Sequence, residues 1–427
     1  MGRWRQRLAR WLNLAPGEGP GVLGALTLFY LLFTGYFMLR PVRETMGVAG
    51  GIDNLQWLFT GTFIATLACL PLFGWLVSKV RRRRILPWTY AFFASNLVLF
   101  AVLLQRDPEG LWQARAFYIW LSVFNLLAIS LAWSVLADVF SSEQSKRLFG
   151  LFAAGASLGG LSGPMLGTLL VAPLGHAGLL VLAALLLLGS ILAVLYLQRW
   201  RAQHPLPGDS EQAACRPVGG NPWAGASAVL RTPYLLGIAV FVLLLASVST
   251  FLYFEQARLV SETFTDRTRQ TQVFGLIDTV VQTLAILTQV FFTGRLARRL
   301  GVGVLLVGVP LAMAVGFVWL ALAPTFALFV AVMVLRRAGE YALVRPGREM
   351  LFTVLPNEAK YKAKNFIDTV VYRGGDALSG WLKRALDVLG EHPQLAMLIG
   401  GVLAVAWGAT GHWLGRRQRG LERGNGC

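Results

Sequence analysis

Charged residues are scarce in this chain. They make up 14% of its 427 residues, whereas a soluble domain carries about a quarter. Hydrophobic residues make up 56%, and the mean hydropathy is +0.58. Uncharged runs such as 22–39, 178–197 and 302–321 reach about 18–20 residues, enough to cross a hydrocarbon core of ~30 Å. The composition excludes an ordinary soluble protein and predicts an all-α protein with many membrane-spanning helices.

Cysteine and histidine are also rare, and the motifs of soluble catalysis are absent. The chain has three cysteines, Cys69, Cys215 and Cys427, and four histidines. Their spacing gives neither a disulfide framework nor a paired metal site. The sequence contains no phosphate-binding Gly-x-x-x-x-Gly-Lys-Ser/Thr loop, no His-Glu-x-x-His and no nucleophile elbow. We therefore expect no enzyme activity, no metal and no cofactor.

The few charges are strongly unbalanced, with a formal net charge of +18. In a soluble protein this surplus would indicate nucleic-acid binding. Here Lys and Arg concentrate in alternate connecting segments, which fits the positive-inside rule and places both termini in the cytoplasm. The basic amphipathic segment 1–20 is expected to lie on the inner membrane surface or to act as an orientation signal. We expect a lipid bilayer around the chain and no nucleic-acid partner.

A short loop pattern occurs twice, about 220 residues apart. The pattern is Gly-x-Leu followed by a tight basic turn, first at 74–84 and again at 294–301. A repeat at half the chain length indicates a bundle built from two related halves. That architecture belongs mostly to transporters.

Twelve helices are predicted from the apolar runs. Their expected spans are 21–46, 53–78, 85–105, 112–139, 147–170, 175–198, 234–260, 271–294, 302–323, 324–352, 362–388 and 394–414. The polar stretch 199–233 lacks an apolar period and is expected to be a cytoplasmic linker. The predicted organisation is a basic N-terminus (1–20), two six-helix bundles (21–198 and 234–414) joined by this linker, and a basic cytoplasmic tail (415–427).

The two halves can be aligned at an offset of about 215 residues. Gly159-Gly160 then matches Gly374-Gly375. With this internal alignment and the repeated loop, the sequence resembles the major facilitator superfamily over nearly its whole length. The loop at 74–84 departs from that family's Gly-x-Leu-x-Asp-Arg-x-Gly-Arg-Arg signature, because Ser78 stands where Asp is usual. The resemblance implies twelve transmembrane helices in two pseudo-symmetric six-helix bundles.

The predicted fifth helix carries a glycine-proline pattern that is similar to a signature of antiporters in this superfamily. Glycines every four residues let a neighbouring helix approach closely, and a proline can bend its helix. Two interpretations stay open, simple close packing and an antiport-linked hinge. The residues are Gly155, Gly159, Gly163, Pro164 and Gly167.

Four segments also resemble bacterial relatives of the ATP:ADP antiporters, the nucleotide exchange transporters. They are 39–44, 136–144, 336–341 and 360–369. This narrower resemblance implies exchange of a nucleotide-like anion.

Charges near the middle of predicted helices are the candidates for a substrate site. A charge at membrane depth costs at least ~2.5–3.5 kcal/mol on insertion scales, so it should face a cavity or a partner. Arg336, Arg337 and Arg373 are expected to bind phosphate or carboxylate groups through paired donors. Glu340 and Tyr341 are expected to lie beside them.

The alternative for the same residues is a set of structural ion pairs. Glu340 can pair with Arg336 or Arg337 along one helix face, since they are four and three residues apart. Arg373 can pair with Glu340 or Asp278. The candidate residues for coupling charge or protons to transport are Asp278, Asp376 and Glu340.

Charges at both ends of the predicted helices suggest gates. Those at the outer ends of the first and seventh helices are expected to form an external gate, for example through an Arg40–Glu255 pair. Those in the cytoplasmic loops are expected to hold the inner end closed. In both places the alternative is ordinary solvated or snorkelling charge. The external candidates are Arg40, Arg43, Glu44, Glu255 and Arg258, and the cytoplasmic candidates are Asp138, Glu143, Arg81, Arg83, Glu349 and Lys364.

Without an ATP site, transport must be driven by a gradient or by exchange. The sequence favours a monomeric transporter of the bacterial inner membrane that exchanges a small anionic metabolite, such as a nucleotide-like or phosphorylated one. A proton-driven exporter of small molecules is the alternative within this class. A transport-inactive membrane scaffold or sensor is the alternative from another class.

Overall fold

The computed structural model describes residues 14–15, 17–79, 82–204, 225–389 and 393–424. Within these residues the regular structure is helical throughout, with no β-strand. The chain divides into two compact units, and neither is one continuous stretch. Unit 1 comprises Met1–Met46, Cys69–Gly219 and Asp266–Thr279, and unit 2 comprises Gly47–Ala68, Gly220–Thr265 and Val280–Cys427. The predicted boundary between two sequential bundles stays a prediction.

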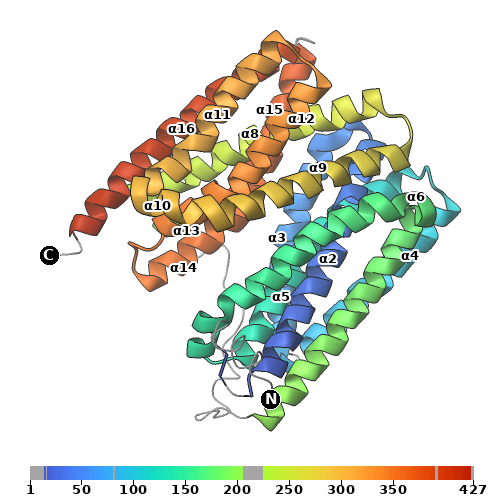
Figure 1. Ribbon diagram of the computed structural model, residues 1–427. Coiled ribbons are helices and arrows are strands. Elements are labelled where there is room, and N and C mark those ends of the chain that lie inside the picture. The colour runs from blue at the N-terminus through green and yellow to red at the C-terminus, as the bar shows by residue number, and fades with distance from the viewer. Residues whose placement is uncertain (1–13, 16, 80–81, 205–224, 390–392, 425–427) are drawn as a thin grey trace. The chain divides into compact units, whose positions relative to one another are not determined.

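Unit 1 contains four long helices (Figure 1). They are α2 (Gly19–Ala49), α4 (Arg82–Arg106), α5 (Leu111–Val139) and α6 (Ser142–Gln203). Helix α6 holds both the fifth and the sixth predicted helices and folds back on itself between them. The reversal occurs at Gly175, whose φ of 66° lies in the left-handed region that favours glycine. Helix α4 packs against both α5 and α6.

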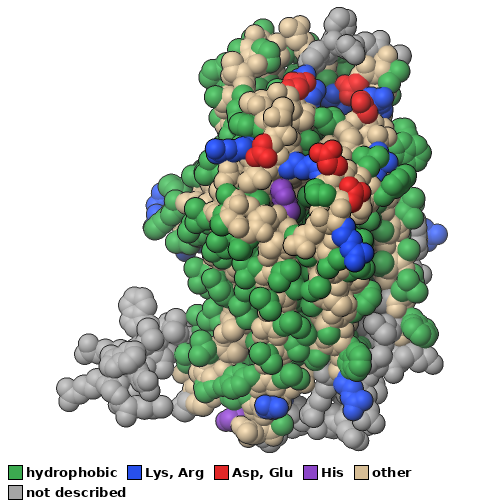
Figure 2. Space-filling model, turned by 90° about the vertical axis from the view of Figure 1, so that its right-hand side faces the viewer, with side chains coloured by type: hydrophobic (Ala, Val, Ile, Leu, Met, Phe, Trp, Pro, Cys, Tyr) green, Lys and Arg blue, Asp and Glu red, His purple; other side chains and the backbone are tan. Residues whose placement is uncertain are grey.

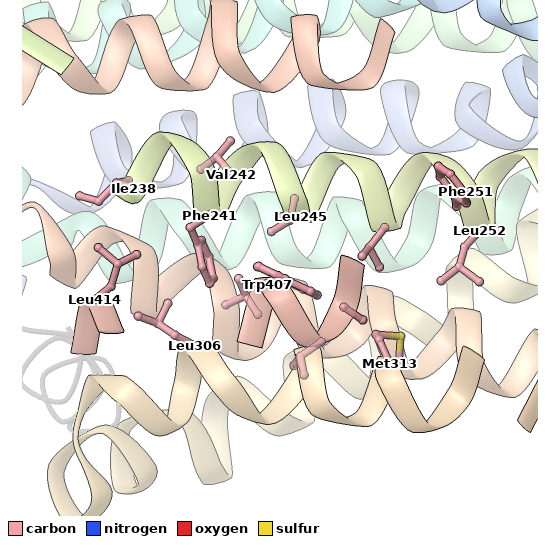
Figure 3. Close-up of a cluster of buried hydrophobic side chains, with 14 of the residues drawn as sticks. Ile238, Phe241, Val242, Leu245, Phe251, Leu252, Leu306, Met313, Trp407 and Leu414 are labelled. Atoms are coloured by element: carbon pink, nitrogen blue, oxygen red, sulfur yellow. The ribbon is translucent and has the colours of Figure 1, made fainter. Parts of the chain in front are cut away.

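Unit 2 is built on α8 (Pro233–Thr263), which packs against α15 (Tyr372–Leu389) and α16 (Pro393–Gly424). Helix α11 (Val302–Leu322) packs along α16. Figure 3 shows the apolar core between them, where Phe241 of α8, Leu306 of α11 and Trp407 of α16 meet. Because lipid is as apolar as this core, dense packing rather than water exclusion holds these helices together. Helix α16 continues through the predicted tail to Gly424.

Two helices are divided between the units near their middle, whereas only the last three residues of α2 fall in unit 2. Helix α3 (Leu55–Lys79), preceded by the short turn η1 (Ile52–Asn54), begins in unit 2 and ends in unit 1. Helix α9 (Arg267–Thr288) begins in unit 1 and ends in unit 2. These are the two helices that precede the repeated basic loops.

The predicted helices 271–294, 324–352 and 362–388 are each interrupted by a five-residue π-turn. These turns are η4 (Gln289–Thr293), η5 (Glu340–Val344) and η6 (Ile367–Val371). After η4 the chain continues as α10 (Gly294–Leu300), so the predicted basic turn at 294–301 is helical up to its last residue. The turn itself is at Gly301, with φ 82°. The second interrupted helix is α12 (Phe326–Gly339) followed by α13 (Arg345–Leu351), and the third is α14 (Asn357–Phe366) followed by α15.

Nine helices of the described chain are long and apolar enough to cross a bilayer. One of them is α6, which contains two predicted crossings. The predicted helices 324–352 and 362–388 fall outside this set because of the charged residues that they carry. The nine helices, the second crossing within α6 and these two further helices correspond to the twelve predicted crossings. On the face that Figure 2 shows, hydrophobic side chains cover much of the surface, which suits contact with lipid.

Candidate functional site

The predicted substrate-binding residues of the tenth helix lie in unit 2. Arg336 and Arg337 lie in the last turn of α12 and are buried, with 8% and 6% of their surface exposed, and Glu340 is the first residue of η5. Arg336 Nη1 donates to Glu340 Oε2 at 3.0 Å and to Ser249 Oγ of α8 at 2.6 Å. The pairing at a spacing of four is the one that the sequence suggested. It neutralises two buried charges that would each be costly alone.

A further arginine, Arg345, reaches the same carboxylate. Its Nη2 lies 3.4 Å from Glu340 Oε1, and its guanidinium carbon lies 4.4 Å from the centroid of the Tyr341 ring. Sequence spacing did not identify Arg345, because it follows Glu340 by five residues and regular helical neighbours are three or four apart. The π-turn brings it there.

The predicted residues of the eleventh helix contact α8. Arg373 Nη1 lies 3.8 Å from Asp376 Oδ2, and the Thr250 hydroxyl of α8 donates to Asp376 Oδ1 at 3.3 Å. Next to them, Ser379 of α15 bonds Ser247 of α8 at 2.8 Å. Arg373 therefore pairs along its own helix, whereas the structural interpretation expected Glu340 or Asp278 as its partner.

Positive charge exceeds negative charge along these two helices. A second ion pair, Arg348 Nη2 to Asp368 Oδ1 at 3.1 Å, lies nearer the predicted cytoplasmic end and was missed from sequence. Between positions 336 and 376 the described ion-paired or buried groups are five arginines and three carboxylates. They are Arg336, Arg337, Arg345, Arg348 and Arg373, with Glu340, Asp368 and Asp376; the half-exposed pair of Lys364 with Glu349 adds one charge of each sign.

The predicted external gate residues of the first helix belong to unit 1. Arg40 Nε lies 3.6 Å from Asp278 Oδ2 of α9, and the Asp278 side chain is only 3% exposed. This pair joins a predicted gate residue to a predicted coupling residue. The Arg40–Glu255 pair spans the two units and stays a prediction.

Arg43 ties α2 to α5. It donates to Glu44 Oε1 at 3.0 Å and to Ser122 Oγ at 3.1 Å, and its guanidinium carbon lies 4.0 Å from the Tyr118 ring centroid. In unit 2 the remaining gate candidates pair along α8, Arg258 with both Glu255 and Glu262.

The predicted cytoplasmic gate residues are placed less uniformly. Lys364 Nζ lies 2.5 Å from Glu349 Oε2, which joins α14 to α13. Asp138 and Glu143 are exposed. Arg81 lies outside the described residues, and Arg83 lies in the first turn of α4.

Glu18, which sequence analysis did not single out, is buried before the start of α2. Its carboxylate accepts hydrogen bonds from Ala15 N at 2.8 Å, Gln144 Nε2 at 2.9 Å and Arg147 Nη2 at 2.6 Å. Burial opposes ionisation, but these bonds outweigh it and lower the pKa of Glu18 from its ordinary value. Gln144 also closes a capping box with Ser141 at the start of α6.

The glycine pattern of α6 faces α2. An added Cβ would lie 2.7 Å from Leu26 O at Gly155 and 2.6 Å from Tyr30 O at Gly159. At Gly163 and Gly167 it would lie 2.7 and 2.9 Å from the carbonyls of residues 34 and 38. The four glycines thus let the two backbones touch over three helical turns. On the other side of this segment, Gly275 of α9 approaches Thr168 and Pro164 O.

Comparison with known proteins decides the family. The sequence profile of the Major Facilitator Superfamily matches residues 22–340, which is most of the chain. The chain belongs to this superfamily. It is therefore a membrane transporter protein and not an enzyme by family, which agrees with the prediction from the repeated loop. The comparisons support this broader family only and give no support to the narrower resemblance to ATP:ADP antiporters.

Relatives within the superfamily are diverse. The tetracycline resistance protein, class C, of Escherichia coli is 27% identical over 71% of this chain and 72% of that protein. A solved bacterial homologue of the iron transporter ferroportin, inward-facing, aligns with a TM-score of 0.62 at 18% identity, over 92% of this chain and 98% of that one. A solved nucleoside transporter gives a TM-score of 0.61 at 14% identity, over 92% and 99%. These structural likenesses establish the fold.

Within a major facilitator fold, the cluster on α12, α13 and α15 has the chemistry of an anion site. Arginine presents several N–H donors in a planar fork that matches carboxylate and phosphate oxygens. The Nε–H of Arg336 is buried and has no hydrogen-bond acceptor among the described residues. An anionic group would supply one.

Proposed function

We propose that this superfamily member is a secondary active transporter for a small anionic metabolite, working by alternating access. The observation that carries the proposal is the surplus of arginine over carboxylate between positions 336 and 376. Glu340 is shared by Arg336 and Arg345, so these ion pairs leave more positive than negative charge. Buried charge is costly in a membrane protein, and a ligand of the opposite sign would offset part of this cost.

In this proposal Arg336, Arg337 and Arg373 bind the anion, with Tyr341 beside it. Paired N–H donors give arginine an advantage over lysine for phosphate and carboxylate. Glu340 holds Arg336 in place and can exchange its hydrogen bond with the arriving anion. The substrate thus replaces part of an internal ion pair and adds negative charge to a site that carries more cations than carboxylates.

Asp278, Asp376 and Glu340 are proposed to couple charge or protons to transport. Each lies in a buried or half-buried ion pair, so adding a proton to the carboxylate releases its arginine. For Asp278 the released residue is Arg40, a proposed external gate residue. The proposed cycle therefore breaks the Arg40–Asp278 pair when the outer end opens.

The remaining elements of the proposal are an exchange mode, a bacterial inner membrane with both termini in the cytoplasm, and a monomeric protein. The positive-inside distribution of Lys and Arg supports the orientation. A nucleotide-like substrate rests only on the narrower sequence resemblance, so nucleotides enter as one group of probes among several.

The proposal is tested by ligand-induced thermal stabilisation of the purified protein in detergent. The probes are inorganic phosphate, nucleoside phosphates, sugar phosphates and organic acids. We expect at least one probe to raise the unfolding temperature, and Arg337→Ala to remove that shift. Arg106→Gln, at an exposed position on α4, is the matched control and should keep the shift.

Failure of every probe to stabilise the wild-type protein would argue against the proposal and favour a transport-inactive scaffold. A shift that Arg337→Ala leaves unchanged would place the anion elsewhere.

A proton-driven exporter of small molecules is the second candidate. The glycine-proline segment of α6 and the 27% identity to a tetracycline resistance protein favour it. Efflux driven by an imposed pH gradient, with no counter-substrate inside the vesicles, would select the exporter over the exchanger.

A further inference from the structure

The π-turn η5 lies directly after the buried arginines and directly before a proline. Pro346 is the second residue of α13. A proline has no N–H, so in a regular helix it leaves the carbonyl four residues earlier without its donor. That carbonyl belongs to Ala342. The adjacent carbonyl of Tyr341 loses its regular donor as well, because the Arg345 N–H bonds to Glu340 O, five residues back.

Two side chains of the π-turn η4, in the predicted eighth helix, supply donors to these carbonyls. Thr293 Oγ1 lies 2.7 Å from Ala342 O, and Gln289 Nε2 lies 2.9 Å from Tyr341 O. The Thr293 hydroxyl is also 3.2 Å from Thr288 O, but a hydroxyl has one proton, and the shorter contact takes it. Thr293 and Ala342 are buried, at 8% and 0% exposure, so an unpaired carbonyl here would be costly.

The extra residue of the π-turn decides which side chain faces Glu340. In an unbroken α-helix the fourth residue after Glu340 lies on its face, and that residue is Val344. With one residue inserted, Arg345 takes the place, and its guanidinium lies 3.4 Å from the carboxylate. Glu340 is thereby held between Arg336 on one side and Arg345 on the other.

We infer that Gln289 and Thr293 are positioning residues, which hold η5 in the π register and so keep Arg345 beside Glu340. Loss of the two donors favours a return to α-helical register. In that register Val344 lies beside the buried carboxylate of Glu340, in place of Arg345. π-Turns are often retained at functional sites despite their poorer geometry. The consequence for anion binding rests on the proposed function, whereas the positioning of Arg345 does not.

A double-mutant cycle on thermal unfolding tests the positioning. Thr293→Val keeps the shape and removes the donor, and we expect it to lower the unfolding temperature by roughly 3 °C. In a Glu340→Gln background the same change should cost about 2 °C less, since no carboxylate is left without its cation. Thr293→Ser, which keeps the hydroxyl, should have the unfolding temperature of its parent protein in each background.

Thr410→Val is the matched control, because the Thr410 hydroxyl bonds only Ala406 O of its own helix α16. Its effect should be the same with and without Glu340→Gln. Additive effects of Thr293→Val and Glu340→Gln would overturn the inference. If Thr293→Val does not fold, Gln289→Leu takes its place in the cycle with the same criterion.

Binding of inorganic phosphate, measured by calorimetry on the same proteins, separates this inference from the proposed function. We expect Thr293→Val to weaken phosphate binding about tenfold and Thr293→Ser to retain it. If wild-type protein binds neither phosphate nor any probe of the panel, the proposed function fails, and the unfolding cycle still decides whether Thr293 positions Arg345.

Discussion

In the first half of the chain, α6 contacts α2 through glycines that lie against backbone carbonyls. In the second half, α12 and α15 contact α8 through arginine, hydroxyl and carboxylate groups. The halves align at an offset of about 215 residues. At that offset Arg336 and Arg337 fall opposite Leu121 and Ser122. A repeated scaffold thus does not require repeated chemistry, and the two halves are free to specialise in packing and in binding.

The backbone follows the same division. Among the described residues, π-turns occur only after position 288, in the eighth, tenth and eleventh helices. A π-turn re-aims the side chains that follow it, which suits a site that must place several arginines around one carboxylate.

The largest expected effect comes from the Arg40–Asp278 ion pair, which joins α2 to α9 in unit 1. Asp278→Asn removes the carboxylate beside Arg40 and should lower the free energy of unfolding by about 3 kcal/mol. The measurement is a denaturant titration in mixed micelles. The charge-exchanged variant Arg40→Asp with Asp278→Arg should recover part of the loss. Equal stability of Asp278→Asn and wild type would show that the pair contributes nothing.

Glycine substitutions sharpen the contrast between repeat-equivalent positions. Gly159→Ala places a methyl 2.6 Å from Tyr30 O and should cost about 2 kcal/mol of unfolding free energy. At the equivalent Gly374 the methyl would meet only the Phe63 side chain, at 3.5 Å, so Gly374→Ala should be close to neutral. The same titration measures both, and equal costs would contradict the assignment of tight packing to the first half alone.

The two ion pairs near the predicted cytoplasmic end of the second half should differ in strength. Arg348 is 14% exposed and pairs with Asp368, whereas Lys364 and Glu349 are 34% and 47% exposed. Arg348→Gln should therefore cost about 1.5 kcal/mol and Lys364→Gln about 0.5 kcal/mol, because water and salt screen exposed pairs. The control is 0.5 M salt, which should erase the effect of Lys364→Gln first. A larger loss from Lys364→Gln would reverse the assignment.

A weaker effect than that of Arg348→Gln is expected at Glu18, which joins the start of α2 to α6. The pKa of Glu18 is lowered in the folded protein from its ordinary value of 4.5, which approximates the pKa in the unfolded chain. The ionised carboxylate therefore contributes its full stability above pH 4.5. This contribution is lost as the pH falls through the pKa of the folded protein. Glu18→Gln should be about 1 kcal/mol less stable than wild type at pH 7. The difference should shrink below pH ~4.5. A difference that stays constant from pH 7 to pH 3 would exclude ionisation of Glu18 as its cause.

Much of the helical pattern could be predicted because apolar length alone sets it in a membrane protein. The expected span 112–139 is α5 to within one residue, and the spacing of Arg336 and Glu340 indicated their ion pair. The hairpin inside α6 and the extension of α16 to Gly424 changed boundaries only, since helix ends depend on local caps and turns.

Long-range pairs and the π-turns could not be predicted in the same way. The partner of Arg40 is Asp278, more than 200 residues later, and no periodicity connects them. Pro346 was a visible signal of irregularity in the tenth helix, but the π register depends on donors from the eighth helix. Glu18 was missed because its three donors come from a loop and from the start of α6.

Counterflow into liposomes tests the claim that the second half binds the transported anion. Vesicles containing the purified protein are loaded with the probe that gives the largest thermal shift, and uptake of the labelled probe is followed. We predict that wild type and Arg106→Gln accumulate label, and that Arg337→Ala, inserted at the same density, stays at the level of empty liposomes. Undiminished uptake by Arg337→Ala would contradict the account.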